Sequence, residues 1–181
     1  MLIGLCGLAG AGKTTAIEIL QQHGHGMRVY VGAMVTAEVK HRGLPRTPAS
    51  EKLVREELRS AEGMGALAQR ALPWIHATLS THRIALVDAI YCEAERDIYR
   101  AEFGQKFAML AVATSVENRA TRLSIRNLRP LSPDDLATRD RYEIERLGTT
   151  QVMDLADHTI CNDGSLDEFE QALDHFIAAA A

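Results

Sequence analysis

Short runs of apolar residues alternate along the chain with longer stretches in which apolar positions follow helical spacing. Five runs have the length and composition of buried strands: residues 2–6, 28–31, 84–87, 107–113 and 159–161. Strands that alternate with helices are typical of βαβ units, in which helices cover both faces of a parallel sheet. The pattern therefore predicts an α/β fold, and the length of 181 residues fits a single domain spanning residues 1–181.

Three of the predicted helices have clear start signals. Thr47-Pro48 and Ser132-Pro133 each place an N-cap residue before a proline, which suits the first turn of a helix. Ser165 and Glu168 form the capping-box pattern and begin the last helix. The apolar positions of that helix, residues 169, 173, 176 and 177, share one face, as in a helix packed on a core.

Two helical segments are longer than the crossovers of a plain βαβ fold require. One spans residues 35–79, and the other, residues 119–155, is strongly charged. A small enzyme that transfers phosphate needs one segment to hold the acceptor and another to close over the donor phosphates and exclude water. We expect the acceptor segment at residues 35–79 and a lid at residues 119–145.

Composition and charge exclude several classes of function. The net charge of −4 gives no broad electrostatic attraction to nucleic acid or to an anionic membrane. No apolar run approaches the roughly 20 residues of a transmembrane helix. The apolar start of the chain is short and lacks the basic residues of a signal peptide. We therefore expect a cytoplasmic protein with small-molecule partners, and the sequence leaves its oligomeric state open.

Cysteine and histidine spacings do not favour a site for a transition metal. Cys6, Cys92 and Cys161 lack C-x-x-C spacing, and two of them fall in predicted strands, so we expect buried thiols. The sequence His23-Gly24-His25 is interpreted as an ordinary loop.

A complete phosphate-binding motif, G-x-x-x-x-G-K-[ST], follows the first predicted strand at residues 7–14. Its glycines allow the backbone to curl so that several N–H groups face phosphate oxygens. Lys13 brings a positive charge to the β- and γ-phosphates, and the Thr14 hydroxyl can ligate Mg²⁺. As an exposed loop residue, Lys13 is expected to add nothing to the core.

The surroundings of the motif support this interpretation. Residues 14–22 predict a helix, and its positive N-terminus would face the bound phosphates. The motif therefore predicts binding of a nucleoside triphosphate. The residues expected to hold it are Gly7, Ala9, Gly10, Ala11, Gly12, Lys13, Thr14 and Thr15.

A carboxylate, Asp88, ends the third predicted strand. Parallel strands end at the edge of the sheet where ligands bind. In P-loop proteins an aspartate at this place meets the Mg²⁺ shell, directly or through water. Capping of the next turn would also explain it. We assign Asp88, with Thr14, to the metal, and Asp88 and Lys13 to catalysis.

Four arginines, spaced by three, four and three residues, would line one face of a helix in the predicted lid. Glu117 is the acidic residue nearby, so the arginines repel one another unless an anion is present; a solvated basic face is the alternative. Arginine binds phosphate through paired hydrogen bonds, as a closing lid requires. The four are Arg119, Arg122, Arg126 and Arg129. We expect Arg126 and Arg129 to act in catalysis and Arg122 to bind the nucleotide.

Further arginines are secondary candidates. Arg139 and Arg141 are expected at the start of the next helix. Arg42, Arg59 and Arg70 are candidates for binding an anionic acceptor, although solvation at the surface would explain each of them. Trp74 is interpreted as a packing residue because it lies at helical spacing from Arg70 and Leu67.

Together, these motifs resemble nucleoside monophosphate kinases, most closely the dephospho-coenzyme A kinase branch and its small archaeal adenylate kinase-like relatives. The resemblance rests on the phosphate loop, the strand end Val87-Asp88, the arginine-bearing lid and the closing run of residues 156–166, and it covers nearly the whole chain. It implies a P-loop three-layer sandwich with a five-stranded parallel sheet in the order 2-3-1-4-5, a mobile lid, and ATP with Mg²⁺ as donor. It also implies that Asn162 lies beside the adenine, although turn formation explains Asn-Asp-Gly equally well.

Two positions depart from the pattern of that family. Ala33 stands where these kinases carry an aspartate after the second strand, and Asp88 is followed by Ala89-Ile90-Tyr91 where Gly-Ile-Arg is common. Both positions lie on the acceptor side, so the donor site is intact and the acceptor chemistry is altered.

The sequence therefore predicts a kinase that moves the γ-phosphoryl group of ATP to a small phosphorylated acceptor, a (deoxy)nucleoside monophosphate or dephospho-coenzyme A. The alternative is a nucleotide-binding regulator or ATPase that kept the donor site and lost the usual acceptor chemistry. A GTPase switch is disfavoured because the chain lacks Asn-Lys-x-Asp, and Asp88 is not followed by the glycine of Asp-x-x-Gly.

Overall fold

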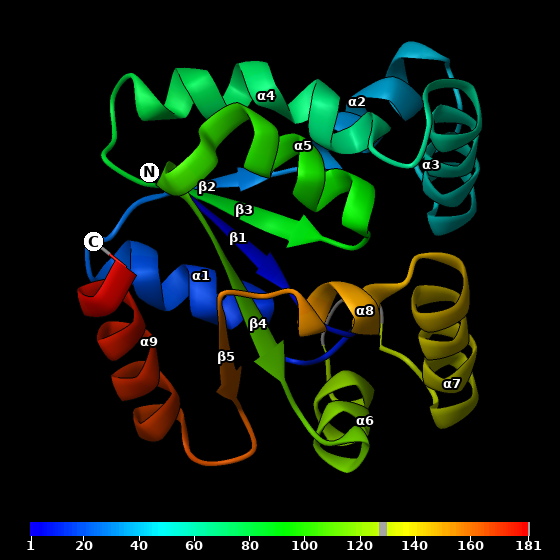
Figure 1. Ribbon diagram of the computed structural model, residues 1–181. Coiled ribbons are helices and arrows are strands. Elements are labelled where there is room, and N and C mark those ends of the chain that lie inside the picture. The colour runs from blue at the N-terminus through cyan, green and yellow to red at the C-terminus, as the bar shows by residue number, and fades with distance from the viewer. Residues whose placement is uncertain (127–129, 181) are drawn as a thin grey trace.

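Five parallel strands form one sheet in the order β2-β3-β1-β4-β5 (Figure 1). The computed structural model describes residues 1–126 and 130–180. The strands are β1 (Leu2–Cys6), β2 (Met27–Tyr30), β3 (Ala85–Ile90), β4 (Phe107–Ala113) and β5 (His158–Cys161). The α/β class and the strand order predicted from the sequence are confirmed.

The central strands are mostly apolar because helices cover them on both faces, and Asp88 in β3 is the charged exception. Every residue of β1 and β3 is buried, whereas the edge strands β2 and β5 bury one residue each, Val29 and Ile160. Cys161 follows Ile160 on the edge strand and is exposed, so the expectation of a buried thiol there is wrong. Cys6 lies in β1, where burial raises the pKa of its thiol to about 12.

Two layers of helices enclose the sheet. α1 (Lys13–Gln22) and α9 (Leu166–Ala180) cover one face (Figure 1). α4 (Ala66–Leu79) and α5 (Glu93–Phe103) cover the other, with the short α8 (Thr149–Asp154) beside α5, and the 3-10 turn Gly104–Lys106 leads from α5 into β4. Burial of each large aliphatic side chain in these layers stabilises the fold by about 1.5–3 kcal/mol. The layers therefore provide a rigid base for polar loops at the edge of the sheet.

Hydrogen bonds confirm the predicted helix starts. Thr47 Oγ1 accepts a hydrogen bond of 3.2 Å from the Ser50 N–H at the start of α3 (Pro48–Glu62). Capping boxes join Ser132 to Asp135 at α7 (Pro133–Arg141) and Ser165 to Glu168 at α9.

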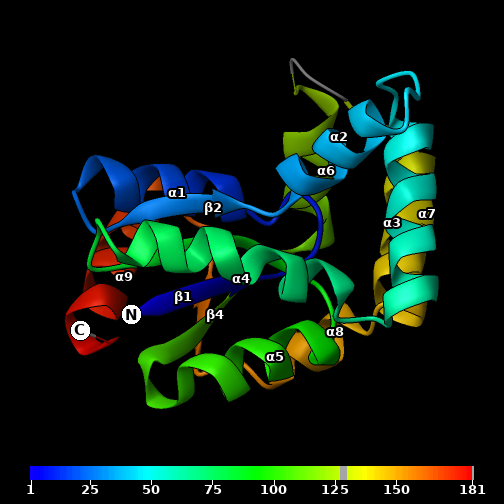
Figure 2. The ribbon, with the colours of Figure 1, turned by 90° about the horizontal axis from the view of Figure 1, so that it is seen from above.

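The first long helical segment, between β2 and β3, contains three helices. α2 (Gly32–His41) and α3 stand away from the sheet, whereas α4 returns to pack on β2 and β3 (Figure 2). α4 is therefore the crossover helix between these strands, and the placement of an acceptor segment at residues 35–79 stays a prediction.

The second long helical segment, between β4 and β5, contains α6 (Val116–Ser124), α7 and the π-helical turn Tyr142–Arg146, which leads to α8. Because the Ser132 cap begins α7 at Pro133, Arg139 and Arg141 lie in its last turn, and the expectation that they begin a helix is wrong. α3 and α7 both lie beyond the carboxyl ends of β1 and β3 (Figures 1 and 2). In the part of the chain that the structure describes, no helix combines the length and the apolar character needed to cross a bilayer.

Candidate functional site

The phosphate-binding motif forms the loop between β1 and α1, with Lys13 as the first residue of the helix. Gly12 has φ +107°, a left-handed conformation that favours glycine. A Cβ atom at Gly12 would lie 2.3 Å from Asn162 Nδ2, so the loop also needs the missing side chain for space.

Side chains from three parts of the chain hold the carbonyl oxygens of this loop. Lys13 Nζ donates to the Gly7 and Leu8 carbonyls, at 2.6 and 3.0 Å. The Ala9 carbonyl accepts from Arg119 Nη1 at 3.1 Å, and the Ala11 carbonyl accepts from Asn162 Nδ2 at 2.8 Å and Thr114 Oγ1 at 3.0 Å. With the carbonyls of Gly7, Leu8, Ala9 and Ala11 engaged, N–H groups of the loop remain to offer a ligand, an arrangement that binds anions.

A carboxylate already occupies one of these donors. The Ala9 N–H donates to Glu143 Oε2 at 3.1 Å, and Glu143 Oε1 accepts from Arg139 Nε at 2.8 Å. Glu143 is buried on the π-helical turn after α7. Glu143 was not predicted from the sequence. Its spacing of four residues from Arg139 was the available signal, but that spacing is also typical of a surface ion pair.

Lys13 is buried, with 8% of its surface exposed, so the expectation of an exposed loop residue is wrong. Burial lowers the pKa of its ammonium group, and the negative charges of Glu143 and Asp88 oppose this shift. The ammonium group also lies 5.7 Å from the centre of the Tyr91 ring. Lys13 is thus held at the centre of the site by loop carbonyls and nearby carboxylates.

Asp88, in β3, is buried near the phosphate loop, as its effect on Lys13 indicates. Its carboxylate accepts a hydrogen bond from Arg28 Nη2 in β2, and the Arg28 guanidinium lies 4.7 Å from the centre of the Tyr30 ring. Arg28 was not predicted as a site residue, because an arginine in an edge strand belongs to no recognisable sequence motif. The role of Asp88 as a magnesium ligand stays a prediction, and an ion there must share the carboxylate with Arg28.

The arginines predicted to bind the acceptor are all engaged in ion pairs. Arg59 Nη2 donates to Glu95 Oε1 at 3.2 Å, with both side chains buried, and Glu95 Oε2 accepts from the Tyr91 N–H at 2.8 Å. Arg59 thus holds the segment that carries Tyr91. On the surface, Arg42 pairs with Glu38 and Glu57, and Arg70 pairs with Glu62 through two nitrogens.

A different arginine, Arg55 of α3, lies near Arg139, whose positive charge helps to lower the pKa of the Arg55 guanidinium. Burial lowers the pKa of its guanidinium, and Glu51, whose carboxylate lies 4.0 Å away, opposes the shift. Arg55 of α3 and Arg139 of α7 therefore bring two positive charges toward the phosphate loop from separate helices. Arg55 was not predicted from the sequence, because there it looks like any other exposed position of an amphipathic helix.

The predicted lid arginines divide into different roles. Arg119 is buried and forms two hydrogen bonds with Asp140, at 2.8 and 2.7 Å. The expectation that the four arginines lack an acidic partner is therefore wrong for Arg119, because α7 folds back and brings Asp140 to it. Arg122 Nη2 donates to the Asn162 carbonyl at 2.8 Å, and its Nη1 is buried without a partner among the described residues. Arg126 is exposed after α6, and Arg129 lies outside the described residues.

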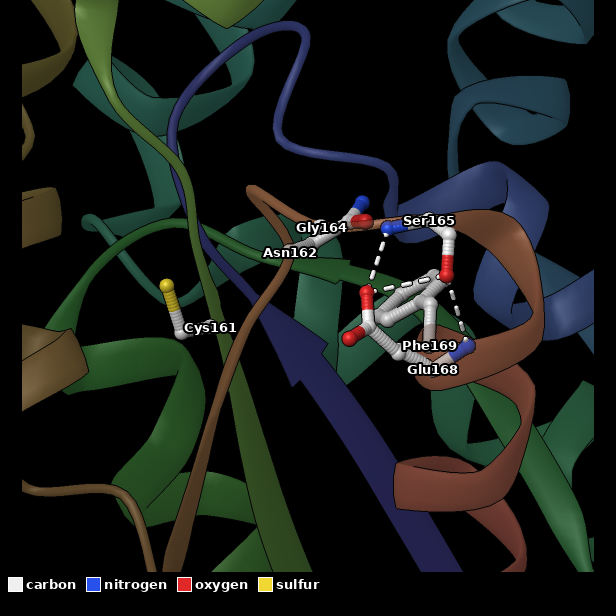
Figure 3. A pocket seen from close by; sticks show the side chains of 6 residues that line it. All are labelled: Cys161, Asn162, Gly164, Ser165, Glu168 and Phe169. Carbon is white, nitrogen blue, oxygen red and sulfur yellow. Dashed lines mark hydrogen bonds between the residues drawn. The ribbon is translucent and has the colours of Figure 1, made fainter.

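A cavity of about 230 Å³ lies at the junction of β5 and α9, beside the phosphate loop (Figure 3). Its lining includes Phe169 and Asn162, although the Asn162 amide donates to the Ala11 carbonyl. Asp163 ties this junction to α6: it accepts hydrogen bonds from Ser115 and Asn118, which lower the pKa of its carboxyl. The placement of adenine here stays a prediction.

A second cavity, of about 380 Å³, lies where β2 meets α4. Its lining is mainly apolar and comprises Arg28, Val29, Tyr30, Ala33, Trp74, Ala77 and Thr78. Trp74 is 44% exposed and Tyr30 48% exposed, so the interpretation of Trp74 as a packing residue is wrong. Ala33 lines the same cavity, and Arg28 connects the cavity to Asp88.

Comparison with known proteins supports a phosphate-loop protein. Residues 3–134 match the family model described as "AAA domain". A "UPF0200 protein" of Methanothrix thermoacetophila is 34% identical over 179 residues, which cover 95% of this chain and 93% of that protein. A "UPF0200/UPF0201 protein" of Archaeoglobus fulgidus is 34% identical over 174 residues, which cover 95% of this chain but 53% of that protein. The chain thus spans about half the length of the latter relative.

Solved structures share the whole fold at low sequence identity. The structure of TT1252 from Thermus thermophilus has a TM-score of 0.71 and 19% identity, covering 100% of this chain and 98% of that chain. The shikimate kinase from Bacteroides thetaiotaomicron has a TM-score of 0.60 and 13% identity, covering 99% and 97%. A gluconokinase from Sinorhizobium meliloti has a TM-score of 0.57 and 18% identity, covering 99% and 92%.

These findings define a P-loop NTPase with a kinase-like fold. The chain belongs to the UPF0200 family. The names of the UPF0200 relatives state no activity, so the resemblance to the dephospho-coenzyme A kinase branch stays a prediction.

The clamp on the phosphate loop can be tested with two glycine substitutions. Gly12→Ala and Gly43→Ala both place a side chain at a left-handed residue, but nothing lies within 4 Å of a Cβ at Gly43. We expect Gly43→Ala to lower the free energy of unfolding by about 1 kcal/mol and to leave nucleotide binding unchanged. Gly12→Ala should cost about 1–2 kcal/mol more, because it displaces Asn162 from the Ala11 carbonyl, and should abolish nucleotide binding. Denaturant unfolding and calorimetric titration measure both effects; equal nucleotide affinity in the two variants would contradict the clamp.

Proposed function

We propose that this chain is an ATP-dependent phosphotransferase that moves the γ-phosphoryl group of ATP to a small acceptor. The observation that carries the proposal is the phosphate loop, whose carbonyls are held by side chains while the Ala9 N–H binds an anionic carboxylate. A loop that accepts a carboxylate at this N–H is also suited to a phosphate oxygen. ATP and Mg²⁺ are the donor pair that this loop type serves.

The donor side of the proposed reaction is built from residues around the loop. Lys13 would neutralise charge on the transferred phosphoryl group, and Arg139, whose positive charge acts on Lys13, could join it, with Arg55 beside Arg139. Mg²⁺ fits the oxygen ligands at this edge, namely the Thr14 hydroxyl and the Asp88 carboxylate. When bound, the ion would neutralise phosphate charge. Positioning and charge neutralisation supply most of the catalysis in phosphoryl transfer, so an additional base is not required by the chemistry.

The cavity between β2 and α4 is our candidate for the acceptor site. Tyr30 and Trp74 supply exposed aromatic faces, and Arg28 supplies a positive charge next to Asp88. Such a lining suits an acceptor with a flat ring and an anionic group, because aromatic side chains stack on rings and arginine binds phosphate. A nucleoside monophosphate and dephospho-coenzyme A both have this chemistry.

A second function, that of a nucleotide-binding regulator or ATPase, is favoured by specific contacts. Arg28 pairs with Asp88, and Ala33 stands where the resemblance to nucleoside monophosphate kinases leads one to expect an aspartate. A protein without an acceptor would still bind ATP through the loop.

The two functions are separated by incubating the full chain with Mg²⁺, labelled ATP and a panel of nucleoside monophosphates and dephospho-coenzyme A. Labelled acceptor identified by product mass supports transfer; label released only as phosphate supports the ATPase, and no turnover with intact ATP binding supports the regulator.

Lys13→Met tests the donor site. The variant should retain the fold but lose about 1–3 kcal/mol of stability, since the Gly7 and Leu8 carbonyls lose a donor. Turnover should fall by at least about 100-fold, because charge on the phosphoryl group loses its cation. Steady-state kinetics and thermal denaturation measure these effects, with the exposed Lys40→Met as matched control. Turnover equal to that of the control would remove Lys13 from the mechanism.

Glu143→Gln tests whether the carboxylate competes with phosphate. Removing its charge should tighten ATP binding by about 10-fold, which corresponds to about 1.4 kcal/mol, because an anion no longer has to be displaced from Ala9. Glu145→Gln removes the same charge from an exposed position of the same turn and should leave the affinity unchanged. Calorimetric titration with ATP measures both affinities. Weaker binding by Glu143→Gln would mean that the carboxylate assists the nucleotide instead.

Trp74→Ala tests the acceptor cavity. Loss of aromatic stacking costs about 1–3 kcal/mol per ring, so the KM for the acceptor should rise by about 10-fold while the KM for ATP stays constant. Trp74→Phe keeps a ring and should retain most of the affinity. If Trp74→Ala changes neither constant, the acceptor binds elsewhere.

A further inference from the structure

Three potential metal ligands meet at the end of α1 that lies farthest from the phosphate loop. The side-chain ligand atoms of His23, His25 and Asp174 all lie within 4.8 Å of one another. His23 Nδ1 is 3.0 Å from Asp174 Oδ1, and His25 Nε2 is 3.7 Å from the same oxygen. The interpretation of His23-Gly24-His25 as an ordinary loop missed this cluster, because Asp174 lies on α9, 151 residues after His23.

The backbone fixes the two histidines relative to each other. Gly24 has φ +76°, and its N–H donates to the Gln21 carbonyl at 3.0 Å, while the His25 N–H donates to the Leu20 carbonyl at 2.8 Å. These two bonds are those of a Schellman motif, which ends a helix and reverses the chain. His23 and His25 therefore flank a defined turn, and both rings approach α9.

We propose that His23, His25 and Asp174 form a binding site for a divalent transition metal, Zn²⁺ being the ion that the donor set fits best. Two imidazole nitrogens and one carboxylate oxygen are zinc ligands, and three protein ligands leave a fourth position for water. Bonds of about 2.0–2.1 Å in a tetrahedral site place ligand atoms roughly 3.3 Å apart. The distances to Asp174 of 3.0 and 3.7 Å lie on either side of this value.

A simple hydrogen bond between a histidine and a carboxylate does not explain the arrangement. Such a bond needs one imidazole, as in the exposed pair of His76 and Glu102 at 2.9 Å. Here a second imidazole approaches the same oxygen of Asp174, and the side chains are between about a third and a half exposed, so an ion and its water have access. In the described part of the chain, this is the group of three histidine, cysteine or acidic side chains whose ligand atoms all lie within 4.8 Å of one another.

Zinc at this site would link the end of α1 to α9, the two helices that cover one face of the sheet. The site is separate from the proposed phosphotransfer centre. The ten residues of α1 place about 15 Å of helix between Lys13 and the histidines. Metal binding and nucleotide binding can therefore be measured independently.

The test is a calorimetric titration of the nucleotide-free full chain with Zn²⁺, combined with thermal denaturation. The parent carries Cys161→Ser, because the exposed Cys161 thiol, 3.4 Å from Asp163, offers zinc another ligand pair. His25→Ala and Asp174→Asn each remove one ligand from the parent. His76→Ala, in the histidine–carboxylate pair that lacks a second imidazole, is the matched control.

We expect one Zn²⁺ per chain in the parent, and at least about 10-fold weaker binding in either ligand variant, since loss of even an outer partner of a ligand costs that much. At zinc concentrations about 100-fold above Kd, the Tm of the parent and of the His76→Ala control should rise by about 5 °C. The ligand variants should show a smaller rise at the same zinc concentration. Absence of binding in the parent, or equal binding in parent and ligand variants, would overturn the proposal. Circular dichroism of each variant without zinc shows that the fold is retained.

Discussion

The side chains that hold the carbonyl oxygens of the phosphate loop are the constraint on which the site depends. Lys13 comes from α1, Arg119 from α6, and Asn162 from the residue after β5. Each donates to a carbonyl of the loop, and loss of a donor to a buried carbonyl costs up to about 1–3 kcal/mol. The shape of a loop near the N-terminus is therefore supported by segments more than 100 residues away in the sequence.

The phosphate loop also contacts the helical segment between β4 and β5. Glu143 binds the Ala9 N–H, and Arg139 binds Glu143, so the turn after α7 is held against the loop by an anion. In the proposed function, a phosphate takes the place of this carboxylate, and Arg139 becomes available to the phosphate. The exchange would couple nucleotide binding to the position of the lid without any new fold element.

Most of the fold and part of the site could be predicted from the sequence. The phosphate loop and the helix caps depend on local patterns, which single residues such as Gly12 and Ser132 reveal. The partners Asp140, Glu143 and Asp174 were missed because their contacts join segments that only the folded chain brings together. Exposure was also misjudged for Lys13 and Trp74, since burial depends on neighbours from other elements. Arg42, Arg59 and Arg70 were predicted to bind the acceptor from their charge alone, and in the structure each forms an ion pair with a glutamate.

A crystal structure of the chain with Mg²⁺ and a non-hydrolysable ATP analogue tests the central claim most directly. The account predicts that a phosphate oxygen accepts the hydrogen bond of the Ala9 N–H, while the loop carbonyls keep their bonds to Lys13, Arg119 and Asn162. It also predicts that Glu143 leaves Ala9 and that Arg139 turns toward the phosphates. A structure in which Glu143 remains on Ala9 while the nucleotide is bound would contradict the account.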